Sequence, residues 1–243
     1  MKRLTLLFCL LAVAYTGYAS EQVYFKIAVN EHDYSTFLTD RISAQKSTLQ
    51  YLATQMRQPY FHPERLNPKY YKVVESSGIK YFDRDVVQYD VIPILNDRFH
   101  HVLMVDVKEG VVIRKEVYDT DGKLVFAFTS LDRTAEEAEP EAQHTSVHPL
   151  ADAFKGYSLV VDKTLKDGTR HMGFTDGLNG FSVFTKETES TSEDELKGIK
   201  RILYGNYIYR KRVGKELYTV VGSLPFREME LLVENIVKLE EKK

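Results

Sequence analysis

The chain has 243 residues, a formal net charge of −2 at pH 7 and no tryptophan, while tyrosine and phenylalanine are abundant. A length of this order fits one large or two modest globular domains, and the many aromatic residues suit a twisted β-sheet with half-buried faces. The mildly acidic balance argues against nucleic-acid binding, which uses a basic stripe, so no nucleic-acid partner is expected.

The N-terminus is typical of a signal peptide. Lys2-Arg3 form a basic start, residues 4–14 an apolar run and residues 17–19 a small-x-small cleavage site. The run is shorter than the roughly twenty residues that span a bilayer, although an uncleaved N-terminal anchor is the alternative. The sequence therefore predicts that residues 1–19 are removed between Ala19 and Ser20 and that the protein is soluble and periplasmic.

Cysteine use fits that prediction. The single cysteine, Cys9, lies inside the apolar run, so the mature protein has no disulfide and depends on its core for stability. Cleavage also removes two basic residues and no acidic one, which changes the formal net charge from −2 to −4.

An N-terminal antiparallel β domain is predicted over residues 20–132. Residues 23–29 read as a strand and residues 40–56 have a loosely helical pattern, after which the hydrophobic period becomes two. Turn residues at 77–78, 96–97, 109–110 and 120–122 separate the following runs, so an antiparallel meander is predicted. Its strands are residues 70–75, 79–83, 86–95, 100–107, 111–118 and 124–130.

A domain boundary is predicted next. Residues 133–147 are rich in glutamate and nearly free of apolar side chains, which is typical of a solvated linker. A second domain, residues 148–243, follows, with a loop or short exposed helical turn predicted at 187–195. Its strands are predicted at residues 158–161, 171–174, 181–186, 201–209 and 217–221.

The last predicted element is a helix that packs on the second sheet. Its apolar residues recur at i, i+3, i+4 and i+7, with Ser223 as the expected N-cap and Pro225 in the first turn. The apolar stripe consists of Met229, Leu232, Val233 and Ile236.

Five residues are singled out as structural motifs: Asp176, Gly177, Gly180, Gly222 and Pro225. Asp176 is expected to accept hydrogen bonds from its own turn, and the glycines that follow are expected to tolerate positive φ. Gly222 ends a β-branched run. A turn presented to a partner is the alternative, but turn chemistry already accounts for these residues.

No motif supports catalysis, a cofactor or a metal. Aligning Gly122 with the glycine of a calcium loop places Val117 and Phe128 where carboxylates are needed, so a hairpin turn is predicted instead. His100 and His101 are adjacent on a strand and point to opposite faces. No nucleophile elbow occurs, and no acid–base pair can be named, so an enzyme is not expected.

Four segments resemble the RseB/MucB family of periplasmic regulators of an envelope-stress sigma factor. The spacing Thr-Asp-Gly-Leu-x-x-Phe-Ser-Val-Phe at 175–184 and Thr-Val-Val-Gly-x-Leu-Pro at 219–225 carry the resemblance. Residues 153–157 resemble the family's apolar entry segment, and residues 104–122 resemble the last strands of its N-terminal domain. The resemblance extends over residues 66–238.

The resemblance implies an α+β fold: a partial, LolA-like half-barrel of the lipoprotein-carrier type, apparently shortened, and a small β-rich domain with a C-terminal helix. It implies a protein that binds the periplasmic segment of a membrane anti-sigma factor, shields it from proteolysis and releases it when lipid or lipoprotein signals accumulate.

Two alternatives stay open at this point, a lipid or lipoprotein carrier that binds acyl chains and a structural envelope protein that self-associates. The aromatic side chains of the meander are equally consistent with an acyl pocket and with an ordinary core. They are Tyr81, Phe82, Tyr89, Phe126 and Phe128.

Overall fold

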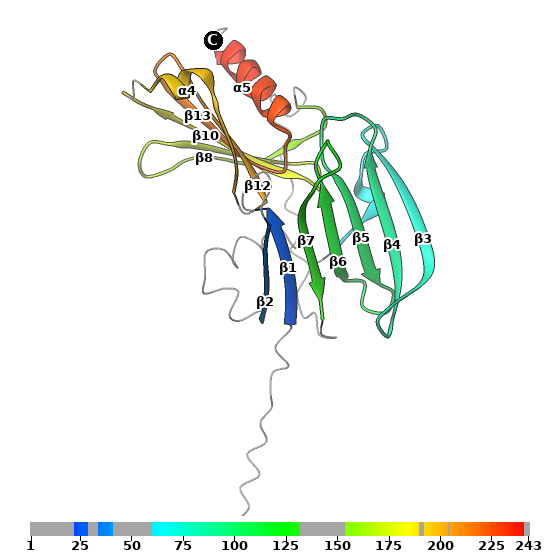
Figure 1. Cartoon of the computed structure of the whole chain (residues 1–243). Helices are drawn as coiled ribbons and strands as arrows, with labels where there is room; N and C mark the ends of the chain where they lie inside the picture. The colour runs from blue at the N-terminus through cyan, green and yellow to red at the C-terminus, as the bar shows by residue number, and fades with distance from the viewer. Residues whose placement is uncertain are drawn as a thin grey trace, which may run out of the picture.

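The computed structural model describes residues 22–28, 34–40, 60–131, 154–189, 192–203 and 205–240. The predicted signal peptide with its Ala19–Ser20 cleavage site, the acidic linker and nearly all of the helical pattern at 40–56 lie outside the described residues. Within them the chain forms two antiparallel sheets and a long C-terminal helix (Figure 1). The predicted α+β class is therefore confirmed.

The first sheet has seven strands in the order β2-β1-β7-β6-β5-β4-β3. Strands β3 to β7 are consecutive, so the predicted meander is confirmed, and β1 pairs with β7 at the far end. The outermost strand, β2, was not predicted. The strands are β1 (Gln22–Ala28), β2 (Tyr34–Asp40), β3 (Tyr71–Tyr81), β4 (Arg84–Pro93), β5 (His100–Asp106), β6 (Val112–Tyr118) and β7 (Leu124–Ser130), with a 3-10 turn η1 (Pro63–Arg65) before β3.

One predicted turn is wrong. Residues 70–75 and 79–83 were expected to be two strands joined at Ser77-Gly78, but they form one strand, β3, whose pairing with β4 shifts between Ser76 and Ile79. Gly78 has φ +73° at this bulge. A glycine with positive φ serves a bulge as well as a turn, so the sequence signal was ambiguous. The hairpin turn lies later, where Phe82 has φ +51°.

The second sheet has six strands in the order β11-β12-β13-β10-β9-β8. The run 201–209 was expected to be one strand, but it is divided between β11 and β12, and Gly205 between them has φ +75°. The short helix α4 (Glu193–Lys197) begins inside the predicted loop at 187–195. The strands are β8 (Ser158–Thr164), β9 (Arg170–Thr175), β10 (Gly180–Glu187), β11 (Ile199–Leu203), β12 (Asn206–Val213) and β13 (Glu216–Gly222).

The C-terminal helix, α5 (Phe226–Glu240), lies across the second sheet (Figure 1). Its buried residues are the four of the predicted stripe, and burial of four such side chains contributes roughly 6–12 kcal/mol before entropy. The Met229 amide donates to the Pro225 carbonyl at 3.0 Å, so the first helical hydrogen bond starts from Pro225. The expectation of Ser223 as N-cap is therefore wrong.

The two sheets share one hydrophobic core. Phe99, on the loop between β4 and β5 of the first sheet, contacts Tyr207 of β12 in the second, with ring centroids 4.9 Å apart. The Tyr207 hydroxyl also donates to Asp119 Oδ2 at 2.8 Å. In the described part of the chain, no helix is long and apolar enough to cross a membrane.

Candidate functional site at the junction of the two sheets

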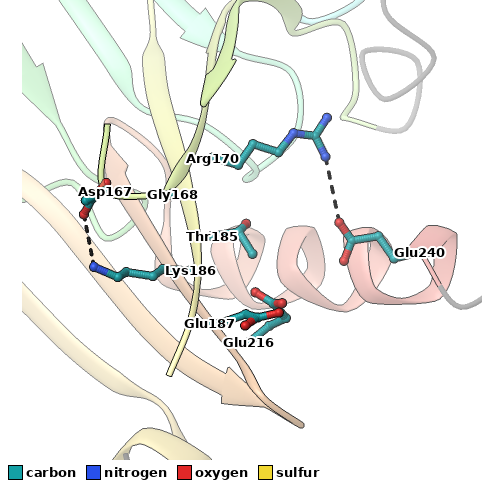
Figure 2. Close-up of a pocket in the computed structure, with 8 residues that line it drawn as sticks. All are labelled: Asp167, Gly168, Arg170, Thr185, Lys186, Glu187, Glu216 and Glu240. Carbon is teal, nitrogen blue, oxygen red and sulfur yellow. Dashed lines mark hydrogen bonds and ion pairs between the residues drawn. The ribbon is translucent and has the colours of Figure 1, made fainter. Parts of the chain in front are cut away.

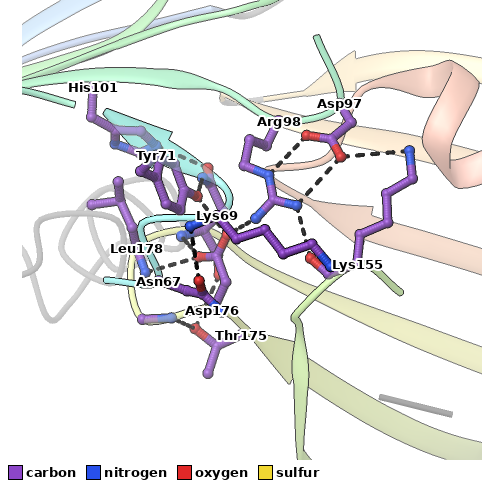
Figure 3. Close-up of polar contacts among 12 residues, drawn as sticks. Asn67, Lys69, Tyr71, Asp97, Arg98, His101, Lys155, Thr175, Asp176 and Leu178 are labelled. Carbon is purple, nitrogen blue, oxygen red and sulfur yellow. Dashed lines mark hydrogen bonds and ion pairs between the residues drawn. The ribbon is translucent and has the colours of Figure 1, made fainter. Parts of the chain in front are cut away.

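An arginine with no exposed side-chain surface, Arg98, lies between the sheets on the loop from β4 to β5. Its Nε donates to Asp97 Oδ1 at 2.8 Å, its Nη1 to Asp176 Oδ2 at 3.1 Å and its Nη2 to the Lys155 carbonyl at 2.9 Å (Figure 3). Asp176 and Lys155 belong to the second sheet's side of the molecule. The guanidinium therefore joins the two halves through charge-assisted hydrogen bonds.

Three tyrosine rings surround the same guanidinium. The Arg98 Cζ atom lies 4.4 Å from the ring centroid of Tyr70, 5.2 Å from that of Tyr71 and 5.0 Å from that of Tyr157. Cation–π contacts of this kind are strengthened when the site is desolvated. Burial lowers the pKa of Arg98, but the hydrogen bond to Asp97 and the neighbouring tyrosines outweigh it, so the pKa is raised and the charge is permanent.

The turn 175–180 reaches this arginine. Asp176 Oδ1 accepts from the amides of Leu178 at 3.0 Å and Asn179 at 2.7 Å, while Gly177 has φ +92°. Asp176 Oδ2 accepts from the Tyr71 hydroxyl and from Arg98. One oxygen thus shapes the turn and the other attaches the turn to the first sheet.

A neutral histidine completes the network. Asn179 Nδ2 donates to the Tyr71 hydroxyl at 2.8 Å, and His101 Nε2 donates to Asn179 Oδ1 at 2.9 Å. Burial, followed by the charge of Lys115, lowers the pKa of His101 well below its ordinary value, although the hydrogen bond to Asn179 opposes this. His101 Nδ1 has no hydrogen-bond partner among the described residues. Protonation of His101 at Nδ1 would create a buried positive charge and an N–H donor that has no acceptor among the described residues.

A polar pocket, separate from the junction, lies at the other end of the second sheet (Figure 2). Glu187 and Glu216 are directly opposite each other across β10 and β13. Burial, then the charges of Glu187 and Glu240, raise the pKa of Glu216. Two cations already have partners here, since Lys186 pairs with Asp167 at 3.1 Å and Arg170 lies 3.9 Å from Glu240. The repulsion is therefore between Glu187 and Glu216, and no group of His, Cys, Asp and Glu residues in the described part of the chain could hold a metal.

Comparison with known proteins decides what this architecture is. The sequence matches no protein-family model, and no curated protein gives a significant match. Solved structures do match: a Pseudomonas aeruginosa MucA/MucB complex has a TM-score of 0.56 and 16% identity over 88% of this chain and 91% of that one. The chain has the MucB fold. A complex of MucB with MucA(peri) and a structure of MucB each match with a TM-score of 0.55 and 17% identity over 87% of this chain and 90% of the other.

The coverage bears on the N-terminal domain, which the resemblance implied to be shortened relative to the family. The β1–β2 hairpin extends the first sheet beyond β7, and the alignment includes about nine tenths of each MucB chain. In its described part, the first sheet of this MucB-fold protein has seven strands.

Four of the five predicted motif residues lie at or beside the start of β10, and Pro225 directly precedes α5. Gly222 has φ +145°, and a Cβ there would lie 2.4 Å from the Gly180 carbonyl oxygen, which accepts from the Ser223 amide at 2.8 Å. Gly180 begins β10 and is not among the residues with positive φ, so the tolerance of positive φ expected from the sequence is not used at this position. Its role here is to bring its carbonyl close to Gly222.

Two further features considered from the sequence are the turn at Asp119 and the adjacent pair His100-His101. Asp119 Oδ1 accepts from the amides of Asp121 at 3.0 Å and Lys123 at 2.9 Å, which is hairpin-turn chemistry. His100 contacts Asp90, whereas His101 turns to the junction.

The aromatic set of the meander does not line one pocket. Phe126 and Phe128 are fully buried in the main core, while Phe82 is 71% exposed at a turn. Tyr81 packs on a separate small cluster around Val86, and Tyr89 contacts Phe61 at a centroid distance of 5.1 Å. Sequence reasoning missed Arg98 and the tyrosines around it. The only local signal was a charged pair, Asp97-Arg98, between the polar Asn96 and the apolar Phe99.

Proposed function

We propose that this chain is a member of the RseB/MucB family and a periplasmic negative regulator of an envelope-stress sigma factor. In this proposal it binds the periplasmic segment of a membrane-bound anti-sigma factor and shields that segment from proteolysis. The observation that carries the proposal is the MucB fold over nearly the whole chain, together with MucB structures that are complexes with MucA.

The junction supports a binding role on physical grounds. Arg98 and the shared core hold the two sheets as one preorganised surface, which lowers the entropic cost of binding a flexible segment. The junction's polar groups are mostly satisfied by one another. A site of this kind is suited to holding a shape and offers no activated nucleophile to a substrate.

The test uses residues 20–243 and the periplasmic segment of each membrane-bound anti-sigma factor that the source organism encodes. Isothermal titration calorimetry should show a stoichiometric complex, and the complexed segment should be cut more slowly by a protease than the free segment. Absence of binding at micromolar concentrations would contradict the proposal.

We also propose that lipid or lipoprotein releases the segment. A ligand can do this only if it binds the unbound form more tightly, so the measured affinity for the segment must fall as ligand is added.

A lipid or lipoprotein carrier would instead co-purify with acyl chains and would not bind the segment. A structural envelope protein would form concentration-dependent oligomers and show no response to lipid.

A further inference from the structure

A small apolar pocket lies beside α5, next to the junction. Its floor is formed by aromatic and aliphatic side chains from three segments, and its rim includes polar groups from both halves of the molecule. The floor consists of Phe154, Tyr157, Phe181, Leu224 and Leu232, and the rim of Asp97, Lys155, Glu228, Leu231 and Asn235. A dry floor with a polar rim is the anatomy of an interface anchor site.

The size of the pocket limits its occupant. Its volume is about 90 Å³. Sites for drug-sized molecules have volumes of roughly 300–1,000 Å³, and an engineered cavity of about 150 Å³ takes a benzene ring. An acyl chain or a whole lipid is therefore too large, whereas one aliphatic side chain of a polypeptide fits.

The rim carries a negative charge excess. Lys155 Nζ lies 3.0 Å from Glu228 Oε2 and 3.5 Å from Asp97 Oδ2, which links the first sheet to the helix along one side of the pocket. With Arg98 and Asp176, the connected cluster has three carboxylates and two cations. Charge complementarity therefore favours a partner with a basic residue beside its apolar anchor.

The rim is held in a fixed shape. Lys155 has φ +59°, an uncommon conformation for a residue with a side chain, and its carbonyl is held by Arg98. A Cβ on the next residue, Gly156, would lie 2.3 Å from the Tyr70 ring. Strained backbone of this kind is found at ligand clamps, where the surrounding structure enforces it.

We propose that this pocket is the anchor site for the partner's periplasmic segment. It receives one aliphatic side chain of that segment, and the adjacent basic residue of the segment pairs with Glu228. The inference rests on the proposed function, because it assigns the surface through which that binding occurs. Leu231, which is 41% exposed at the rim, contacts the inserted side chain and excludes water from it.

The test compares two substitutions on one helix. Leu231→Asp places a charge at the rim, and Leu239→Asp is its matched control, since Leu239 is 39% exposed two turns further along α5. Titration calorimetry with the periplasmic segment should show affinity at least about tenfold weaker for Leu231→Asp and unchanged within about twofold for Leu239→Asp. Glu228→Gln should weaken binding less and reduce its dependence on salt. Both aspartate variants should melt alike, which excludes a folding defect as the cause.

The outcomes separate this inference from the function on which it rests. If the wild type binds the segment and Leu231→Asp binds equally well, the pocket is not the anchor site, although the function stands.

If the wild type does not bind the segment, the function fails, and a random peptide library panned on the intact protein tests the pocket alone. Selected peptides should combine an aliphatic residue with a neighbouring Lys or Arg and should lose binding to Leu231→Asp. Peptides without that pattern would overturn the inference. The inference would also be overturned if binding of the segment did not depend on Leu231 while binding of decanoate, or self-association of the protein, did depend on it.

Discussion

At the scale of single residues, the charge of Arg98 is what makes the junction possible. Two carboxylates, Asp97 and Asp176, are each only 4% exposed and both bind this one guanidinium. Buried carboxylates without a cation are strongly destabilising. Asp97 and Asp176 therefore stabilise the junction while the Arg98 side chain is present, and they destabilise it when that side chain is removed.

We expect Arg98→Met to destabilise the protein by about 3–5 kcal/mol, because it leaves the buried Asp176 without a cation and leaves Asp97 with only the partly exposed Lys155. Chemical unfolding with urea measures this free energy. Arg170→Met is the control, since Arg170 pairs with Asp162 at the surface and such pairs contribute about 0–1 kcal/mol. Equal effects of the two substitutions would show that Arg98 does not hold the sheets together.

Gly177 illustrates a different residue-scale constraint. A Cβ at this position meets no atom within 4 Å, so only the backbone conformation of φ +92° opposes a side chain. Gly177→Val should therefore cost more than about 1 kcal/mol through strain alone. A thermal melt that is unchanged by the substitution would show that the turn can relax.

At the scale of elements, local patterns predicted what depends on local physics. The α5 stripe was found because residues three and four apart share a helix face. The meander was found because alternation and turn residues lie within a few positions of one another. The division of residues 201–209 into two strands was missed although Gly205-Asn206 is a turn-forming pair, because apolar residues flank that pair closely on both sides and read as one run.

The carboxylate pair at the end of β10 and β13 gives an element-scale prediction. Glu187 and Glu216 face each other in register, and like charges in that position destabilise a sheet. Glu216→Lys replaces the repulsion with a cross-strand ion pair and should stabilise the protein by about 0.2–1 kcal/mol. Thermal melts at low and high salt measure this, and the gain should shrink at high salt.

At the scale of the whole molecule, the contacts that join the two sheets were beyond sequence reasoning. Asp176 meets Tyr71 and Arg98 across 105 and 78 residues of chain, and no local pattern records such pairings. The turn at Asp176 was correctly singled out, but turn chemistry explained it fully. Only the folded arrangement assigns its second oxygen to the junction.

The buried His101 makes this junction sensitive to acid. Its pKa is lowered in the folded protein, so below about pH 6.5 the unfolded chain binds a proton that the folded chain resists. Stability must therefore fall as the pH drops through that range. Burial also lowers the pKa of the neighbouring Lys115 to about 7, so its contribution changes between about pH 7 and 10.5, where stability rises with pH.

We expect urea unfolding of the wild type to give a lower free energy at pH 5 than at pH 7.5. His101→Gln keeps a donor toward Asn179 Oδ1 without a titrating group, so its loss of stability between these two pH values should be clearly smaller. Carboxylates titrate at lower pH and affect both proteins alike, and Lys115 remains in both. An identical loss in the variant would mean that acid acts elsewhere, and that the junction between the sheets is not the part of the molecule that responds to protons.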